Sequence, residues 1–498
     1  MGNKEHFNYL TQGVEVWNRW RRENPEVIPD LKGVTMIAAD LKQFDLSRAN
    51  LSGSILNGCD FTEANLKGAD LSMSQLARAN LSKADLQSAN LKYTEIPRAN
   101  LAGADLSDSN CEKATFDGSD LTEIRLSRAN LSGAFLNRVN LTKALIIEAN
   151  LSGAKLRSAN LTNAQIILTD LSNAQLGRAD LSEANLNMVE LSSADLTEAT
   201  LGKASLGGSN LSKAHLNGAH LMGASLPFVT LTEADLSGAN LVRANLIKAN
   251  LSGAKFYNTD LTYANLVEAN VENSSFIDCV IYGVSVWGMK GKPQAQQNLM
   301  ITPRGEATIM VDNLEVAQFI YMLLNHKKIR DVITTIGEKA VLILGRFTPE
   351  RKEVLDAIAE KLRELKYLPI IFDFEKIPGR DYTETVKILA GLSKFVIADI
   401  TAPESVPQES QAIIPDFKIP FVRVIEKAKK AWSMTGDLNL YDWVVKDVIE
   451  YPDKTELIKN LPAVVKLAER KHKELLQKKA QNTIETLSIE ELAEREND

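Results

Sequence analysis

The sequence predicts two unlike folds in one chain: a four-sided β-coil over residues 31–288 and an α/β domain with a five-stranded parallel sheet over residues 339–480. The coil is predicted by an apolar side chain at every fifth position from 31 to 286, without a break. The α/β domain is predicted by short β-branched runs that alternate with helical patterns. We also expect a helical cap over residues 1–30, a linker with connector helices over 289–338 and an acidic tail over 481–498.

The first segment, residues 5–22, has the pattern of an amphipathic helix. Phe7, Leu10, Val14 and Trp17 recur at helical spacing, opposite a polar face. A β-coil leaves unpaired backbone and apolar side chains at both ends. We therefore expect this helix to cap the coil; the alternative is a helix that binds a partner.

The repeat has 52 apolar positions, of which 40 are Leu. A small residue, usually Ala, stands two positions before most of them, so the typical unit reads Ala-(Asn/Asp)-Leu-X-X. A period of five would spread the leucines around an α-helix and would alternate them between the faces of a strand. If each unit instead forms one side of a square coil, the Leu and the small residue point inward. They then stack on the residues twenty positions later, about 4.8 Å away.

On this unit the segment resembles the pentapeptide-repeat proteins, whose known fold is a right-handed quadrilateral β-helix. Some members of that family act as DNA mimics that block type II topoisomerases, which requires a strongly acidic rod. Residues 31–290 contain 22 Lys and Arg against 26 Asp and Glu, so this rod has no such field. We expect a rigid spacer, or a surface for assembly or for an unknown protein or signal, rather than DNA mimicry.

The whole chain of 498 residues has 57 Lys and Arg against 64 Asp and Glu, a net charge of −7. This balance disfavours nucleic acid and anionic membranes as partners. The three cysteines are too few for a disulfide framework or a cysteine metal cluster, which fits a reducing cytoplasm. No run of about 18 apolar residues is present. We expect a cytoplasmic protein with neither a membrane partner nor a metal.

After the linker, Asp312 and Asn313 can cap a helix that runs toward Ile336 with a break near Asn325, and we expect it to pack on the domain that follows. Beyond it the predicted strands are 341–347, 368–374, 395–400, 419–425 and 443–451, and the predicted helices include 349–366, 382–393, 406–414 and 454–479. This alternation indicates a doubly wound parallel sheet. Ligands of such sheets bind outside the carboxyl ends of the strands.

The segments that follow the first three strands therefore carry the candidate site. Guanidinium groups near helix N-termini suit phosphates, and a carboxylate that faces a ribose C1′ suits glycosidic cleavage. The candidates are Arg346, Phe347 and Arg351 around the first segment, Asp373 and Arg380 around the second, and Asp399, Ser405 and Glu409 around the third. Phosphate-loop, dinucleotide-fold, zinc-protease and hydrolase-elbow motifs are all absent from the sequence.

Each of these residues also has a simpler interpretation. Ser405 with Gln408 three positions later is a capping-box pattern, in which Glu409 would only favour the helix dipole. A surface arginine is commonly solvated or ion-paired rather than a ligand. An Asp at a strand end, such as Asp373 or Asp399, commonly caps the following turn rather than binding ribose hydroxyls.

The same region resembles Toll/interleukin-1 receptor (TIR) domains through its strand order, its long second segment and Ser405-x-x-x-Glu409. It also resembles nucleoside 2-deoxyribosyltransferase-like proteins through "SKFVIADIT" and a following Glu. In both families a Glu at this place acts on an N-glycosidic bond, which the resemblance assigns to Glu409. Ser410 follows it where both families often have Leu, so the helix can be posed differently.

The TIR resemblance implies an enzyme that takes NAD as substrate, with no bound cofactor, and releases nicotinamide, as in bacterial antiphage defence effectors. TIR-type sites form across neighbouring copies, which implies a homo-oligomer or filament and gives the rod a role in assembly or sensing. Two other functions stay open. One is a non-enzymatic scaffold, and the other is a nucleoside or nucleotide N-glycosidase.

Overall fold

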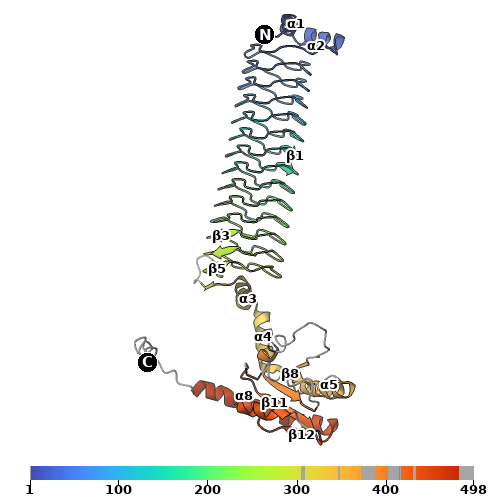
Figure 1. Ribbon diagram of the computed structural model, residues 1–498, viewed down its shortest axis with the longest axis vertical. Coiled ribbons are helices and arrows are strands. Elements are labelled where there is room, and N and C mark those ends of the chain that lie inside the picture. The colour runs from blue at the N-terminus through green and yellow to red at the C-terminus, as the bar shows by residue number, and fades with distance from the viewer. Residues whose placement is uncertain are drawn as a thin grey trace, which may run out of the picture. The chain divides into compact units, whose positions relative to one another are not determined.

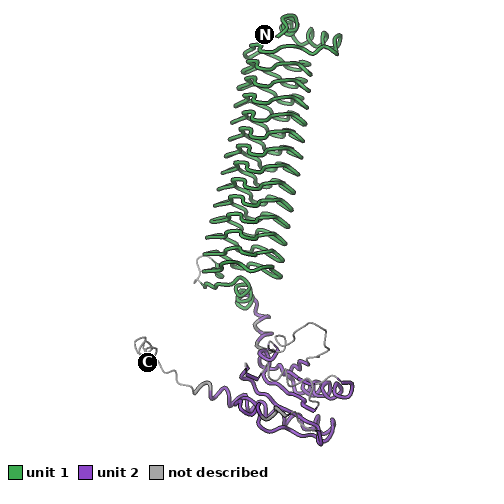
Figure 2. Tube along the Cα trace, viewed as in Figure 1, with its two compact units in different colours: residues 1–324 green, residues 325–498 purple. Residues whose placement is uncertain are grey.

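A computed structural model of the chain describes residues 2–303, 309–345, 348–371, 387, 389–401, 414–415, 417–429 and 433–481. The chain forms two compact units, Met1–Leu324 and Asn325–Asp498 (Figure 2). The boundary lies inside the segment predicted to be linker and connector. Among the described residues, none of the helices combines the length and the apolar character needed to cross a lipid bilayer.

Two short helices, α1 (Lys4–Thr11) and α2 (Val14–Glu23), lie at the first coil of unit 1 (Figure 1). The prediction of one helix over residues 5–22 is wrong, because Gly13 adopts a φ of 96° between them. Trp17 is fully buried, and its indole N–H donates to the Asp45 carbonyl at 2.8 Å. The side-chain amide of Asn18 donates to the Gln43 carbonyl at 2.9 Å. The helices thus cover the open end of the coil.

Unit 1 is a β-helix in which one residue of each five-residue side pairs in parallel with the residue twenty positions later, from Asp30 with Asn50 to Val280 with Met300. This register confirms the predicted coil of four five-residue sides. Where the bridges lengthen they form the short strands β1 (Leu145–Ile147), β2 (Gln165–Ile167), β3 (Lys255–Tyr257), β4 (Ser275–Ile277) and β5 (Ala295–Gln297) (Figure 1).

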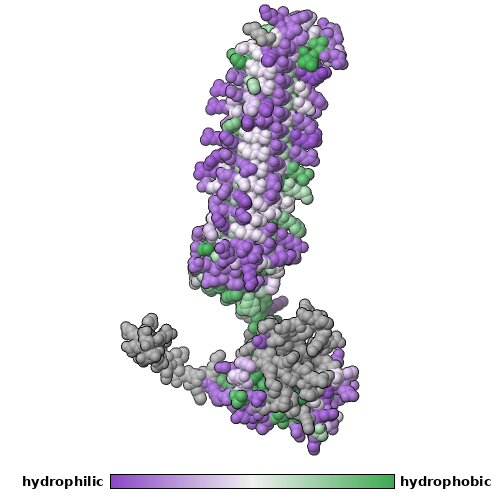
Figure 3. Space-filling view, viewed as in Figure 1, coloured by the Kyte–Doolittle hydropathy of each residue, from purple (hydrophilic) through white to green (hydrophobic). Residues whose placement is uncertain are grey.

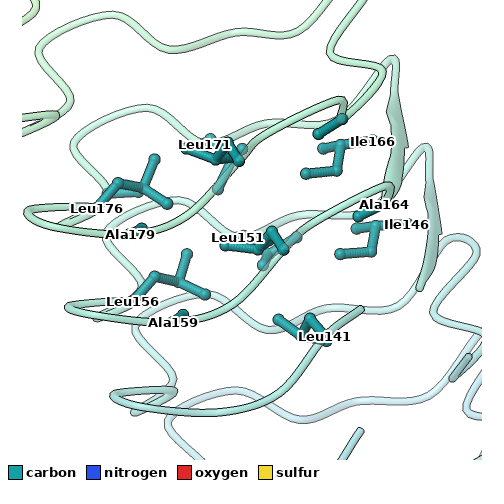
Figure 4. Close-up of a cluster of buried hydrophobic side chains, with 14 of the residues drawn as sticks. Leu141, Ile146, Leu151, Leu156, Ala159, Ala164, Ile166, Leu171, Leu176 and Ala179 are labelled. Atoms are coloured by element: carbon teal, nitrogen blue, oxygen red, sulfur yellow. The ribbon is translucent and has the colours of Figure 1, made fainter. Parts of the chain in front are cut away.

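The interior is a stack of leucine and alanine columns, as Figure 4 shows around Leu151 and Ala159. Of the predicted apolar positions, all but Met36 are buried. At most corners the third residue after the Leu donates its N–H back to the Leu carbonyl, as Ser54 does to Leu51 at 3.2 Å. The second residue after each Leu takes a positive φ, for example 59° at Arg48, which follows Leu46. The chain therefore turns by about a right angle at each corner.

The last coil extends past the predicted end at residue 288. Strand β5 pairs with β4, and β6 (Leu299–Met300) pairs with β7 (Met310–Val311) in antiparallel fashion. Helix α3 (Leu314–Asn325) closes this end: the Val286 N–H donates to the side-chain oxygen of Gln318 at 2.5 Å, and Leu314 is buried in the coil core. The predicted break near Asn325 is confirmed: α3 packs on the coil, against expectation, while the second half of the predicted helix, α4 (Lys327–Lys339), belongs to unit 2 and contacts β8 (Ala340–Leu344).

Unit 2 is a five-stranded, fully parallel sheet in the order β12-β11-β10-β8-β9, which confirms the predicted doubly wound arrangement. Its described elements are α4 (Lys327–Lys339), β8 (Ala340–Leu344), α5 (Pro349–Glu364), β9 (Leu368–Ile371), β10 (Phe395–Asp399), β11 (Phe421–Glu426), a 3-10 helix (Ser433–Leu440), β12 (Ile449–Tyr451) and α8 (Lys454–Gln481). Helices α5 and α8 pack on one face of the sheet (Figure 1).

Two predicted strands are shorter than expected. The strand predicted over 443–451 keeps only β12, because Val444 bridges Phe421 and the chain turns before Ile449. The strand predicted over 341–347 ends at Leu344 in β8. The sequence pattern alone therefore does not mark where a strand begins or ends.

Candidate functional site

The predicted site lies at the carboxyl edge of the sheet in unit 2. Strand β8 lies between β9 and β10 in the sheet. After β8 the chain therefore adds β9 on one side of it and then adds β10 on the other side. In doubly wound sheets the carboxyl ends of such a pair of strands flank the ligand crevice. The segments with the candidate residues begin at this edge, after Gly345, after Ile371 and after Thr401.

Of the candidate site residues, the structure describes Arg351 and Asp399. The others lie outside the described residues, as does most of the helix predicted over 406–414, and their roles stay predictions. They are Arg346, Phe347, Asp373, Arg380, Ser405 and Glu409.

Asp399 is the last residue of β10 and is buried. Its Oδ1 accepts hydrogen bonds from the backbone N–H of Thr401 at 3.1 Å and from the Thr401 hydroxyl at 2.5 Å. Its Oδ2 accepts from Nε of Arg351 at 3.2 Å. Both carboxylate oxygens therefore have donors within the protein, and the contacts to Thr401 are those of a turn cap.

Arg351 lies in the first turn of α5, behind the N-cap Thr348, and its side chain is only 12% exposed. Besides Asp399, its guanidinium donates to Glu426 Oε2 at 2.5 Å and to the Tyr451 hydroxyl. One side chain thus ties together the carboxyl ends of β10, β11 and β12. We call Arg351, Asp399, Thr401, Glu426 and Tyr451 the carboxyl-edge network.

Burial disfavours the charged form of Arg351, but the hydrogen bond and the charge of Asp399 outweigh it and raise the Arg351 pKa. Burial, followed by the charge of Asp399, raises the pKa of Tyr451, which stays a neutral phenol. Because its donors already meet protein acceptors, the Arg351 guanidinium is poorly disposed to bind phosphate. The sequence analysis did not predict this network. Its signal in the sequence is a polar residue at the end of each of three consecutive strands, Asp399, Glu426 and Tyr451.

The network also fixes the point from which the Glu409 segment departs. The Thr401 hydroxyl donates to Asp399 and accepts the backbone N–H of Glu426 at 3.1 Å. Thr401 is therefore held by contacts to two strands. Within the described ranges, no three His, Cys, Asp or Glu side chains are grouped as metal ligands would be.

A pocket of about 420 Å³ lies at the opposite, amino edge of the sheet, where Tyr367 precedes β9 and Lys394 precedes β10. Glu469 on α8 accepts from the Tyr367 hydroxyl at 2.5 Å and from Nζ of Lys394 at 3.1 Å. Burial, and then the charge of Lys394, lowers the pKa of the nearby His472. This pocket is separate from the predicted site, because it opens at the other end of the strands.

Comparisons with known proteins concern the β-helix. The sequence profile of the pentapeptide repeats matches residues 45–82, 84–122, 124–163, 159–197, 190–226, 201–238, 228–262, 239–278 and 254–285. No curated protein matches the chain.

Three solved structures illustrate the similarity. HetL, a pentapeptide repeat protein involved in heterocyst differentiation regulation from the cyanobacterium Nostoc sp. strain PCC 7120, is 32% identical over 44% of this chain and 91% of its own, with a TM-score of 0.22. Rfr23 from the cyanobacterium Cyanothece 51142 is 25% identical over 23% and 87%, with a TM-score of 0.14. QnrB1, a plasmid-mediated fluoroquinolone resistance protein, is 18% identical over 45% and 92%, with a TM-score of 0.15.

The match of the repeat profile runs through the same residues that pair coil by coil in unit 1. The TIR resemblance of unit 2 stays a prediction. From its repeats and the β-helix that they form, the chain belongs to the pentapeptide-repeat family.

Proposed function

We propose that unit 2 cleaves the nicotinamide N-glycosidic bond of NAD, with Glu409 as the acting carboxylate, and that the β-helix serves assembly or sensing. The observation that carries the proposal is the strand order β9-β8-β10-β11-β12. It brings the starts of the segments with Arg346 and Glu409 to the carboxyl ends of two adjacent strands, where nucleotides bind in folds of this class.

The chemistry required of Glu409 is modest. As the bond between ribose C1′ and the nicotinamide nitrogen breaks, its electron pair stays on the leaving nitrogen, so nicotinamide departs neutral. The positive charge that develops on the ribose is stabilised by the carboxylate. Water then adds to C1′ and loses a proton, which gives ADP-ribose.

The carboxyl-edge network supports this proposal through rigidity. A catalytic carboxylate acts well only when its attachment is held in place. Thr401, the residue before the 402–413 segment, is hydrogen-bonded to Asp399 and to the backbone of Glu426. Because Asp399 is paired with Arg351 within the network, it would not compete with Glu409 for the cationic ribose.

The test compares wild type with Glu409→Gln, and uses Glu404→Gln in the same segment as the matched control. NAD loss and nicotinamide release are followed over a range of protein concentrations, with and without a crowding agent. We expect turnover that rises steeply with concentration, falls at least about 100-fold in Glu409→Gln and is kept in Glu404→Gln. Equal loss in both variants, or undiminished turnover by a monomeric form, would contradict the proposal.

A second candidate, a non-enzymatic scaffold, is favoured by the contacts of Asp399 and Arg351. Two polar groups that could have met a nucleotide are instead saturated by the protein itself. On this reading unit 2 is an interaction domain. It is supported if NAD stays intact at every concentration and in every oligomeric state of the purified chain.

A further inference from the structure

One edge of the β-helix is apolar over several consecutive coils, although corner positions elsewhere are mostly polar. The two turn residues of each coil form two adjacent columns along this edge. The outer column contains Leu168, Met188, Gly208 and Phe228, and the inner column contains Ile147, Ile167, Pro227 and Ile247, interrupted at its centre by Asn187 and Gly207. Asn187 Oδ1 accepts from the Ser205 hydroxyl at 2.9 Å and from the Gly207 N–H at 2.7 Å, so this polar group is satisfied within the chain. We call the apolar members of the two columns, with Gly208, the apolar edge.

The outer column of the apolar edge is exposed, and the inner column is half-buried. Leu168, Met188 and Phe228 are 53%, 65% and 62% exposed. Successive coils are joined by backbone hydrogen bonds, such as Phe228 N–H to the Ile247 carbonyl at 3.0 Å, so the columns run parallel to the axis of unit 1. Figure 3 shows hydrophobic residues along the right-hand margin of the middle coils, near the level of β1 in Figure 1.

Charged residues continue the outer column at both ends of the apolar edge. On the N-terminal side the next two residues are Glu148 and Arg128, and on the C-terminal side they are Lys248 and Glu268. The signs therefore run in opposite order away from the centre: negative then positive at one end, positive then negative at the other. This antisymmetry is the property that a self-complementary surface needs.

We propose that the apolar edge pairs with the same edge of a second copy of this chain, with the two β-helices antiparallel. The twofold axis passes between the levels of Met188 and Gly208. Because each column then faces itself in reverse order, apolar residues meet apolar ones, opposite charges meet, and Asn187 faces Gly207. The pairs between copies are Met188 with Gly208, Leu168 with Phe228, Ile167 with Pro227, Ile147 with Ile247, Glu148 with Lys248 and Arg128 with Glu268.

Shape supports the same register. Gly208 has no side chain and faces the most protruding member of the edge, Met188, which is 65% exposed. Each copy thus supplies one projecting side chain and one gap, and two such fits form in the dimer. The larger Leu168 and Phe228 meet on either side of this centre.

Charge selects the antiparallel arrangement over a parallel one. In a parallel pair residues of the same coil would meet, which brings Glu148 near Glu148 and Lys248 near Lys248. Within one chain Arg128 pairs with Asp108 at 2.7 Å and Lys248 with Glu268 at 3.6 Å. These are exposed pairs, which contribute little and can rearrange at low cost. An edge-to-edge contact is narrow, so we expect a weak, concentration-dependent dimer.

The first experiment is sedimentation equilibrium of the full chain. Leu168→Glu and Phe228→Glu should each raise the dimer dissociation constant at least about tenfold, because a carboxylate is desolvated against an apolar side chain. The corner conformation accepts Glu, since Glu148 and Glu183 adopt a φ of 56° and 58° there. Met73→Glu is the matched control, because Met73 is 68% exposed at a corner of another column. It should leave the dissociation constant unchanged.

Gly208→Met tests the register. Met188 adopts a φ of 57°, so a methionine fits this corner. In the proposed pair the new side chain would collide with Met188 of the second copy, and association should weaken although the surface becomes more apolar. Stronger association would mean that the edge associates through non-specific hydrophobic contact and would overturn the register.

Cross-linking tests the orientation, because the native cysteines are buried. A mixture of Leu168→Cys and Phe228→Cys chains should form disulfide-linked dimers, while neither variant should do so alone, since like positions lie about 14 Å apart at three coil spacings. Cross-linking of each variant alone would indicate a parallel pair. The proposal would be overturned if the wild type stays monomeric at all concentrations, or if none of these changes affects the dimer. The partner of the edge would then be a different protein.

The inference concerns unit 1 alone and does not depend on the proposed catalysis.

Discussion

The two units hold an arginine–aspartate pair in opposite ways. In unit 1, Arg128 and Asp108 lie on neighbouring coils with side chains 57% and 43% exposed. In unit 2, Arg351 and Asp399 are 12% and 2% exposed and belong to the carboxyl-edge network. The β-helix keeps its charges outside and spreads its stability over many similar coils. The α/β unit concentrates polar contacts at one edge of its sheet, and we expect it to depend on a few residues.

Arg351→Ala should have the largest effect. It leaves the buried Asp399 carboxylate without its cation, and we expect unit 2 to lose about 3–5 kcal/mol of unfolding free energy. The measurement is denaturant unfolding followed by the helical circular dichroism signal, to which α5 and α8 contribute.

Arg128→Ala is the matched control for that change. It removes the same chemistry from an exposed pair, where we expect about 0–1 kcal/mol. Similar losses in the two variants would show that burial does not separate the units in the way that the structure indicates.

Within unit 1, the corresponding contrast is between an inward and an outward leucine. Leu156 is fully buried in a leucine column, and Leu156→Ala should cost about 2–5 kcal/mol through the cavity that it leaves. Labelling of Cys59, Cys111 and Cys279 under increasing denaturant reports on this unit, because all three thiols are buried there. Leu168→Ala, at an exposed corner, should stay within about 0.5 kcal/mol of wild type.

A smaller effect is expected where the inward residue two positions before the Leu is polar. The hydroxyl of Thr169 donates to the Ile146 carbonyl at 2.8 Å, in the coil before it. Thr169→Val removes this bond, while valine already fits the equivalent positions Val139 and Val189. We expect a loss of about 1 kcal/mol by the same thiol labelling. A gain in stability would mean that apolar packing at this position outweighs the hydrogen bond.

The β-helix could be predicted almost completely because its period of five is a local property that every coil repeats. The role of the Asn or Asp before each Leu was missed. Its Oδ1 accepts the N–H two residues on, as Asn50 does from Ser52 at 3.1 Å, and its amide can reach the coil before, as Asn65 does to Asp45 at 2.9 Å. Both contacts depend on geometry that only the folded coil supplies.

The α/β unit was predictable in its strand sequence but not in its contacts. Arg351 and Asp399 are 48 residues apart, and no local pattern pairs them. The sequence also does not show that Asp399 has both oxygens satisfied. Of the predicted site, Glu409 and the arginines Arg346 and Arg380 lie outside the described residues, so the comparison between prediction and structure rests on Arg351 and Asp399.

The smallest predicted effect is a pH dependence confined to unit 2. Burial, then the positive charge of Lys394, lowers the His472 pKa below its ordinary value. As the pH falls through that ordinary value, the unfolded chain therefore binds a proton before the folded one does, and stability decreases. We expect unit 2 to lose stability from about pH 7.5 to about pH 5.5, and His472→Gln to flatten that slope. The helical signal measures this, while thiol labelling serves as the internal reference for unit 1. The neighbouring Glu469 does not contribute in this range, because its pKa is lowered, first by the Tyr367 hydrogen bond, and it therefore titrates at lower pH. If the slope is unchanged in His472→Gln, the pH dependence belongs to other groups.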